Sequence, residues 1–222
     1  MKKNLFEKKE EQTVSKHNIF ENYLESGISQ VLSKATSKPP RIVYGDKGSV
    51  KQVADGSIIK RFDKTPYPVK PTDVICPHFL ELKWAYGCPF DCSWCYLKGT
   101  FRFRPEGIKP AYKDLEKVKL HVETFLHEVE TPEILNTGEI ADSLMGENGD
   151  CPFSKFIISL FQKQNKHKVL FVTKSTNVKN LLEITSPRQA IVSFSLNAKP
   201  VAEKWEKKTP FVKKRIEAAK KL

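Results

Sequence analysis

Hydrophobic positions follow different patterns in the first and second parts of the chain. Residues 1–16 are charged and lack apolar periodicity, which predicts a disordered tail. Across 17–32, apolar side chains recur every three or four positions, which predicts an amphipathic helix. Residues 41–62 alternate apolar and polar side chains around glycine turns, a pattern typical of short strands, and a proline-rich stretch follows. We therefore predict an appended N-terminal region over 1–75.

Residues 76–222 alternate strand patterns with helix patterns. Four apolar stretches predict strands at 78–86, 133–136, 168–173 and 190–196. Helical patterns follow these strands at 113–130, 154–164, 178–184 and 201–222. Ser154 stands where a serine N-cap would begin the second helix. Repeated strand–helix units with right-handed crossovers predict an α/β fold with a parallel sheet.

Three of the five cysteines lie in one short loop after the first predicted strand. Cys88, Cys92 and Cys95 form a C-x3-C-x2-C motif. Three thiolates with this spacing can bind three irons of a [4Fe–4S] cluster and leave the fourth iron open to a ligand that is not protein. A structural zinc site, the less favoured alternative, would need a fourth ligand such as His78. The sequence therefore favours an iron–sulfur cluster in this loop.

The formal net charge of +12 is concentrated at the two ends of the chain. Residues 1–75 carry 14 basic and 9 acidic side chains, and residues 199–222 carry 9 and 3. Such a surplus favours nucleic acid as a partner through counterion release, although a solvated lysine-rich surface would have the same composition. The sequence has no apolar stretch of membrane-spanning length, no secretory signal and an odd number of cysteines. We therefore expect a cytoplasmic protein without a membrane partner.

The cysteine loop reads G-C-x3-C-x2-C-Y-L, a string that resembles the radical S-adenosylmethionine superfamily and, within it, the spore photoproduct lyase family. Strings at 172–174, 193–198 and 214–219 resemble segments of that family in the same order, so the resemblance covers about 76–222. It implies a partial (β/α) barrel that holds a [4Fe–4S] cluster on the three cysteines and binds S-adenosylmethionine at the open iron. It also implies a lyase-like DNA-repair enzyme that generates a 5′-deoxyadenosyl radical, acts on a nucleic-acid lesion and takes electrons from a reductant such as flavodoxin or ferredoxin.

The resemblance also assigns roles to residues at the ends of the predicted strands. Glu139, which follows a glycine, would accept a hydrogen bond from the methionine ammonium of the cosubstrate. Lys174 and Ser195 match family positions that contact its carboxylate and ribose, and Asn197 lies beside them. Ligands of parallel α/β sheets bind beyond the carboxyl ends of the strands, where all four residues fall. Without the resemblance, the same side chains would be interpreted as ordinary polar residues of turns and strand ends.

Hydrogen-atom transfer is the point at which the sequence departs from the family. Tyr96 follows the last cysteine and matches a family aromatic that shields the cluster or relays a hydrogen atom. When Asp142 is aligned with the family's aspartate, Glu139 occupies the position of the cysteine that donates a hydrogen atom to the product radical. Cys151 or Cys76 would have to supply that thiol. Radical formation is therefore expected, whereas efficient spore photoproduct repair is not.

The chain ends within the fourth predicted helix, whereas the family's barrel has six strand–helix units. We therefore expect a C-terminally truncated product. The main hypothesis is a radical S-adenosylmethionine enzyme of the spore photoproduct lyase-like branch. The alternative is a non-catalytic iron–sulfur or nucleic-acid-binding protein derived from that family.

Overall fold

The computed structural model describes residues 39–45, 48–62 and 79–222, all within one compact unit, Pro39–Leu222. The tail predicted over 1–16, the helix predicted over 17–32 and the proline-rich stretch lie outside the described residues. Within the described residues, every helix is too short or too polar to cross a lipid bilayer.

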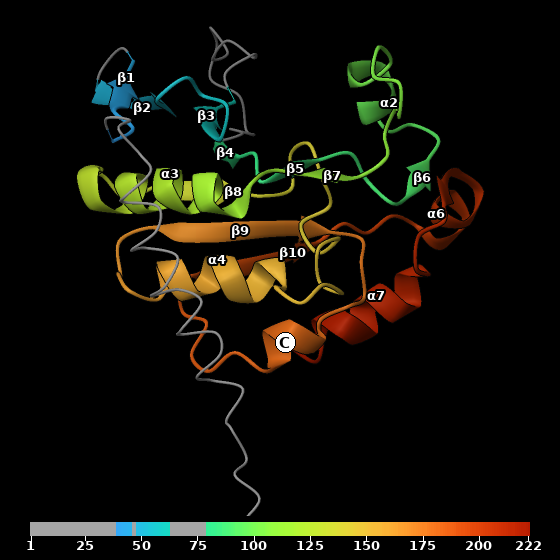
Figure 1. Ribbon diagram of the computed structural model, residues 1–222. Coiled ribbons are helices and arrows are strands. Elements are labelled where there is room, and N and C mark those ends of the chain that lie inside the picture. The colour runs from blue at the N-terminus through green and yellow to red at the C-terminus, as the bar shows by residue number, and fades with distance from the viewer. Residues whose placement is uncertain (1–38, 46–47, 63–78) are drawn as a thin grey trace, which may run out of the picture. The chain divides into compact units, whose positions relative to one another are not determined.

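Seven strands form the main sheet in the order β1-β2-β3-β4-β8-β9-β10 (Figure 1). The first three are β1 (Ile42–Tyr44), β2 (Val50–Val53) and β3 (Ile59–Arg61). The other four are β4 (Leu80–Leu82), β8 (Ile134–Asn136), β9 (Lys168–Thr173) and β10 (Ala190–Phe194). The last four strands pair in parallel, which confirms the predicted parallel sheet.

The strands predicted over 41–62 are present and pair antiparallel with one another. They continue the sheet of the second part of the chain, because β3 pairs antiparallel with β4 through Ile59 and Leu82. Strands on both sides of the undescribed residues 63–78 thus share one sheet. The proposed division of the chain at residue 75 stays a prediction.

The first predicted strand, 78–86, is wrong as a single element. Within its described residues, β4 ends at Leu82, and β5 (Ala85–Tyr86) pairs instead with β7 (Ala111–Tyr112) in a separate two-stranded ribbon. Trp84, between the two strands, turns its side chain into the core. The change of pairing partner falls at this residue, and the chain then continues into the cysteine loop.

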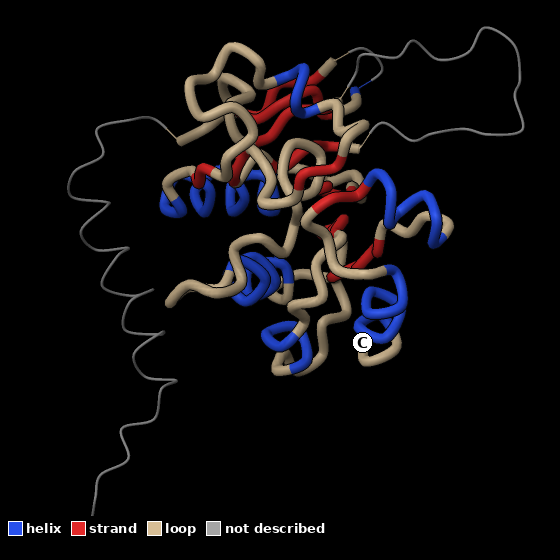
Figure 2. The backbone as a smooth tube through the Cα atoms, turned by 90° about the vertical axis from the view of Figure 1, so that its right-hand side faces the viewer, coloured by secondary structure: helices blue, strands red, loops and turns tan. Residues whose placement is uncertain are grey.

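Helices lie in the crossovers between the parallel strands and also follow the last of these strands (Figures 1 and 2). They are α2 (Leu97–Thr100), α3 (Leu115–Glu128), α4 (Phe153–Phe161), α5 (Lys179–Leu182), α6 (Lys199–Trp205) and α7 (Val212–Ala219). Asp114 begins α3 by accepting a hydrogen bond from the backbone N–H of Glu116 (2.9 Å), as an N-cap residue does.

Two helix predictions need correction. Ser154 is not the cap of α4 but lies inside the helix, where its N–H and hydroxyl both donate to the Glu147 carboxylate (2.9 and 2.6 Å). The acidic side chain, brought from a preceding loop, replaces the local cap. The helix predicted over 201–222 is two helices, because the short strand β11 (Glu206–Lys207) and Pro210 separate α6 from α7.

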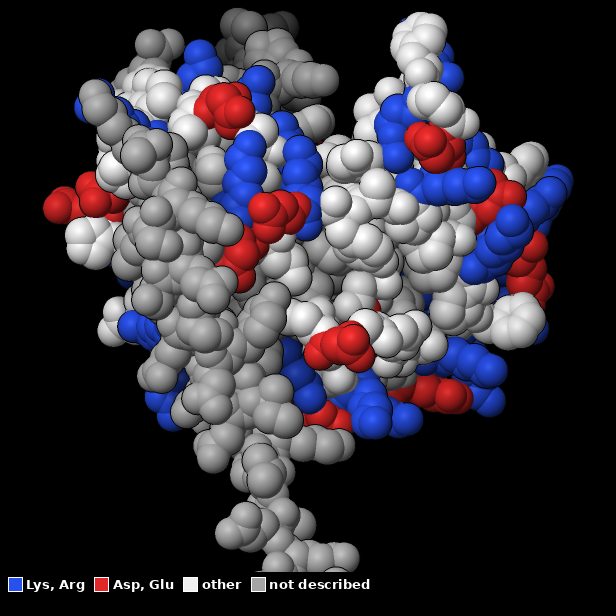
Figure 3. All heavy atoms as spheres, viewed as in Figure 1, with Lys and Arg blue, Asp and Glu red and all other residues white. Residues whose placement is uncertain are grey.

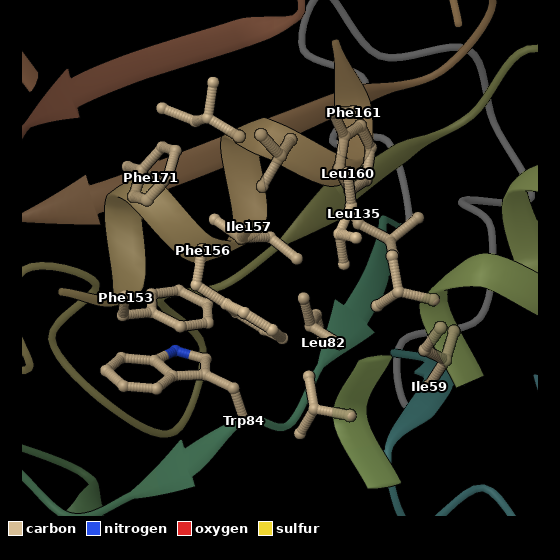
Figure 4. Close-up of a cluster of buried hydrophobic side chains, with 14 of the residues drawn as sticks. Ile59, Leu82, Trp84, Leu135, Phe153, Phe156, Ile157, Leu160, Phe161 and Phe171 are labelled. Carbon is tan, nitrogen blue, oxygen red and sulfur yellow. The ribbon is translucent and has the colours of Figure 1, made fainter. Parts of the chain in front are cut away.

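The core is formed by buried side chains of the sheet, α3 and α4, part of which Figure 4 shows. The indole of Trp84 stacks on Phe153 with ring centroids 3.6 Å apart and donates from Nε1 to the carbonyl of Thr137 (3.0 Å). Phe171 of β9 meets Phe153 edge-on. These contacts fix the carboxyl ends of β4, β8 and β9, from which the candidate site is built.

Candidate active site

Backbone hydrogen bonds hold the cysteine loop on both sides. Cys88 N–H donates to the carbonyl of Ile108 (2.8 Å), and Ser93 N–H donates to the carbonyl of Trp205 (2.7 Å). The short strand β6 (Asp91–Cys92) pairs antiparallel with β11, which sets Cys92 opposite Glu206. The loop is thus positioned by segments far away in the sequence.

Gly87 allows the chain to enter this loop. Its φ is +84°, and a Cβ atom at this position would lie 2.4 Å from the carbonyl oxygen of Lys109. Only glycine combines that backbone conformation with such a close approach.

One cavity of about 320 Å³ collects most of the residues predicted for the site. It is lined by all three cysteines of the motif together with Tyr96, Glu139, Asp142, Lys174 and Ser195. The cysteines follow β4 and β5, Glu139 and Asp142 follow β8, Lys174 follows β9 and Ser195 follows β10. The carboxyl ends of the parallel strands therefore converge on this cavity, as they do in other parallel α/β folds.

Gly138 and Glu139 form the wall contributed by β8. A Cβ atom on Gly138 would lie 2.7 Å from both Ser143 Oγ and Val172 Cβ, so only glycine fits there. The Gly138 N–H donates to Asn136 Oδ1 (2.9 Å), and Asn136 Nδ2 donates to Glu139 Oε2 (3.3 Å). These bonds orient the Glu139 carboxylate along the cavity wall.

Tyr96 closes over this wall. Its hydroxyl donates to the backbone carbonyl of Glu139 and lies 3.4 Å from Glu139 Oε1. Desolvation at the cavity, followed by the negative charge of Glu139, raises the pKa of Tyr96. The phenol therefore stays protonated at neutral pH.

Asp142 joins the ends of β8 and β9 from inside. Its buried carboxylate accepts from Thr173 Oγ1 (2.7 Å), from Lys174 N–H (2.8 Å) and from Leu144 N–H (3.1 Å). Burial raises the pKa of this carboxyl group, whereas the hydrogen bonds that it accepts oppose the rise. The aspartate thereby holds the backbone of Lys174 at the edge of the cavity.

A buried charged network behind the cavity was not predicted from the sequence. Glu206 and Arg215 both have fully buried side chains and form an ion pair with 2.7 Å between Arg215 Nη1 and Glu206 Oε2. Arg215 also donates to the carbonyl of Ser195 (3.0 Å). Lys174 Nζ lies 3.8 Å from Glu206 Oε1, so the network reaches a residue of the cavity. The sequence carried one signal for it, since Arg215 lies in the family-like string at 214–219.

Two predicted site residues lie elsewhere. Asn197 does not line the cavity but donates from Nδ2 to Glu206 Oε1 (2.6 Å), which makes it part of the buried network. Cys151 lines a different pocket, against Trp84 and Phe153. Cys76 lies outside the described residues. The cavity therefore has no thiol among its described lining residues beyond the three of the motif.

The donor set fits a [4Fe–4S] cluster. Within the described residues, no three His, Cys, Asp or Glu side chains converge as ligands of a single metal ion. The thiolates of an iron–sulfur cube each bind a different iron, so they must surround a volume, and the three cysteines line one cavity. All described cysteines are free. Burial raises the pKa of Cys88 to about 12 and also raises the pKa of Cys92, so cluster binding at neutral pH would release these protons.

Comparisons with known proteins agree with this geometry. The sequence model of the family described as spore photoproduct lyase matches residues 79–222. The chain belongs to the spore photoproduct lyase family. The family assignment confirms the resemblance seen in the cysteine loop.

The chain is similar to one curated relative, the spore photoproduct lyase of Bacillus subtilis (strain 168). The two are 29% identical over 145 residues, which cover 64% of this chain and 41% of the relative. The chain thus spans about two fifths of the length of this spore photoproduct lyase.

Solved structures of spore photoproduct lyase share the fold. A complex with dinucleoside spore photoproduct has a TM-score of 0.54 at 20% identity, over 64% of this chain and 41% of the solved one. A mutant with bound AdoMet and dinucleoside spore photoproduct has a TM-score of 0.55 at 20% identity, over 65% of this chain and 41% of the solved one. These likenesses confirm the predicted partial α/β barrel of the radical S-adenosylmethionine type.

Proposed function

We propose that the protein is a radical S-adenosylmethionine enzyme with a [4Fe–4S] cluster held by Cys88, Cys92 and Cys95. One observation carries the proposal: residues from the ends of the successive parallel strands line one cavity with these three thiols. When bound, the cluster and its cosubstrate would supply an electron and a 5′-deoxyadenosyl radical. Membership of the spore photoproduct lyase family supports this chemistry.

The chain's own residues would bind and orient the cosubstrate. Glu139, fixed by Asn136, would accept from the methionine ammonium, and Lys174 would pair with the carboxylate. Ser195 would donate from its hydroxyl to the carboxylate or ribose. Asn197 would act through Glu206, which it contacts directly, and so help to hold Lys174 in place.

Tyr96 is the proposed hydrogen-atom donor or relay. Its protonated hydroxyl lies on the cavity wall, whereas Cys151 lines another pocket. Transfer of a hydrogen atom from the phenol to a substrate radical would leave a tyrosyl radical, which one electron from the proposed reductant and one proton from solvent would return to the phenol. Cys151 could donate a hydrogen atom in the cavity only if its loop adopted a different arrangement.

The proposed substrate is a lesion in nucleic acid. The solved relatives bind dinucleoside spore photoproduct, and the excess of basic residues at 199–222 favours a polyanion. Because Glu139 stands at the position of the family's hydrogen-donating cysteine, we expect a group other than that thiol to quench the substrate radical.

We further propose a flavodoxin or ferredoxin as reductant. We place the protein in the cytoplasm, whose reducing environment suits its free cysteines.

The test is reductive cleavage of S-adenosylmethionine by the anaerobically reconstituted protein. The variants Glu139→Gln, Lys174→Met and Ser195→Ala should keep their iron but bind the cosubstrate about tenfold or more weakly, because each loses a charged or hydrogen-bonded contact. Ser193→Ala is the matched control, since Ser193 is exposed on β10 two residues before Ser195, which follows that strand. Unchanged cosubstrate affinity in all three variants would contradict the assigned roles.

A further inference from the structure

Two tryptophans lie exposed at the edge of the cavity. Trp94 is 48% exposed and also lines the cavity, and Trp205 is 41% exposed. Their ring centroids are 6.5 Å apart at an angle of 40°. The chain's third tryptophan, Trp84, is 1% exposed and packs in the core. Large aromatic side chains that remain accessible beside a candidate active site call for a ligand with a flat apolar face.

The backbone holds this tryptophan pair in place. Ser93 N–H donates to the carbonyl of Trp205, and β6 pairs with β11 directly beside it. Both rings therefore project from segments that are fixed to each other and to the cysteine loop. Their position depends on backbone bonds rather than on burial of the rings.

Positive charge surrounds the tryptophan pair. Lys204 Nζ lies 4.8 Å from the ring centroid of Trp205, and Lys207 and Lys208 follow immediately in the sequence. Asp91, on the facing strand, is neutralised by Lys98 at 2.8 Å. Glu206 is buried against Arg215, so it does not offset the lysines at the surface. Residues 199–222 carry 9 basic and 3 acidic side chains. Figure 3 shows Lys and Arg side chains, with acidic ones among them, on the right-hand side of this face.

We propose that Trp94 and Trp205, with Lys204, Lys207 and Lys208, bind an unpaired segment of nucleic acid at the mouth of the cavity. A base would stack on the indoles, and the flanking phosphates would contact the lysines. This inference rests on the proposed function, because it names the surface that presents the lesion to the same cavity. A base inside a duplex has no free face, so the site selects single-stranded or extruded bases.

The experiment measures binding of a fluorescently labelled single-stranded oligothymidylate to the reconstituted protein by anisotropy. Trp94→Leu and Trp205→Leu should each weaken binding at least fivefold, the lower limit of about 1 kcal/mol for one stacked base. Lys204→Gln should reduce the dependence of affinity on salt. Lys163→Gln, an exposed lysine beyond α4 that precedes β9, is the matched control and should bind normally. The same sequence as a duplex should bind more weakly than the single strand.

Three results would overturn the proposal. The first is wild-type affinity in both tryptophan variants. The second is equal affinity for single strand and duplex. The third is a protein dimer, seen by sedimentation without oligonucleotide, that Trp205→Leu dissociates, because the indoles would then form an interface between copies. Iron content and circular dichroism of each variant verify its folding, and Lys204→Gln tests the site without removing a ring.

This outcome is separable from that of the proposed function. Cleavage of S-adenosylmethionine to 5′-deoxyadenosine without oligonucleotide requires the cavity but not Trp205, which does not line it. Normal cleavage with oligonucleotide binding that ignores the tryptophans would reject this inference alone. Tryptophan-dependent binding by a protein without cleavage would reject the proposed function alone.

Discussion

At the scale of single residues, close packing decides where the Glu139 carboxylate lies. Gly138 approaches Val172 so closely that a Cβ atom would lie 2.8 Å from the Val172 carbonyl oxygen, which belongs to rigid strand backbone. The glycine is therefore needed for the contact between the β8 loop and β9. The orientation of Glu139 follows from that contact.

We predict that Gly138→Ala moves the β8 loop away from β9 and costs about 1–3 kcal/mol of the free energy of unfolding, as overpacking does. S-adenosylmethionine affinity should fall, while iron content should be retained. Gly99→Ala is the control. Gly99 lies in α2, and a Cβ atom at this position meets no atom within 4 Å. Urea unfolding and cosubstrate titration measure both effects, and equal stability of the two variants would contradict the packing argument.

The Arg215–Glu206 ion pair stabilises the support of the cysteine loop. Removal of Arg215 as Arg215→Met leaves a buried carboxylate without its partner, and we expect a loss of about 3–5 kcal/mol in the free energy of unfolding. The double variant Arg215→Met, Glu206→Leu should recover much of that loss, because neither charge then remains buried. Urea unfolding of the parent protein, Arg215→Met and the double variant measures the loss and its recovery. A double variant as unstable as Arg215→Met would show that the charge of Glu206 is not the cause.

At the scale of elements, the sequence predicted what local periodicity determines. The strand predicted at 168–173 has the observed bounds, and α3 lies within its predicted range, because each is a single uninterrupted pattern. The split of 78–86 depends on pairing of Ala85 with Tyr112, which no local pattern reveals. The buried network behind Lys174 likewise needs the turn between α6 and α7 to bring Arg215 onto Glu206. The candidate cavity could be predicted from the strand ends, but its support could not.

His167 connects two elements and makes their contact dependent on pH. Its buried ring accepts from Glu133 N–H at Nδ1 (3.3 Å) and, in that tautomer, donates from Nε2 to the carbonyl of Val129 (3.0 Å). Burial lowers the pKa of His167 in the folded protein below the value of about 6.5 usual for an unfolded chain. The neutral ring therefore contributes stability above pH 6.5, and this contribution is lost as the pH falls through the folded pKa.

We predict that the free energy of unfolding falls between pH 7.5 and pH 5.5 more steeply in the parent protein than in His167→Gln. The control is His127→Gln, since the His127 side chain is 86% exposed and lies outside the core. Chemical unfolding at several pH values gives both slopes. A parent slope equal to that of His167→Gln would contradict the assignment to this ring.

At the scale of the whole molecule, our proposal joins two parts: a cofactor cavity of the kind that the family's chemistry needs, and a changed way of transferring hydrogen. It covers 41% of its Bacillus subtilis relative. The family model matches residues 79–222, which include the strands whose ends lie at the cavity. Among the described residues, the cavity offers a phenol and carboxylates but no thiol beyond the three of the cysteine motif. The two parts of the chemistry, radical formation and radical quenching, can therefore be tested separately.

We predict that the reconstituted protein restores far fewer thymines from spore photoproduct than it forms molecules of 5′-deoxyadenosine. A substrate radical without a thiol nearby persists and enters side reactions. Glu139→Cys should raise the ratio of thymine to 5′-deoxyadenosine even if it slows cosubstrate cleavage, while Cys151→Ala should leave the ratio unchanged. A parent ratio near one would show that the carboxylate at position 139 does not alter the reaction.

The central claim is that the cysteine motif holds a [4Fe–4S] cluster with an open iron in the cavity. Iron and sulfide analysis of the anaerobically reconstituted protein tests it most directly, combined with electron paramagnetic resonance of the reduced cluster before and after addition of S-adenosylmethionine. We predict about four irons per chain. The spectrum should change when the cosubstrate binds. Cys88→Ala, Cys92→Ala and Cys95→Ala should each abolish the cluster, and Cys151→Ala should keep it. Colourless protein with one zinc per chain, or a spectrum that the cosubstrate does not alter, would contradict the account.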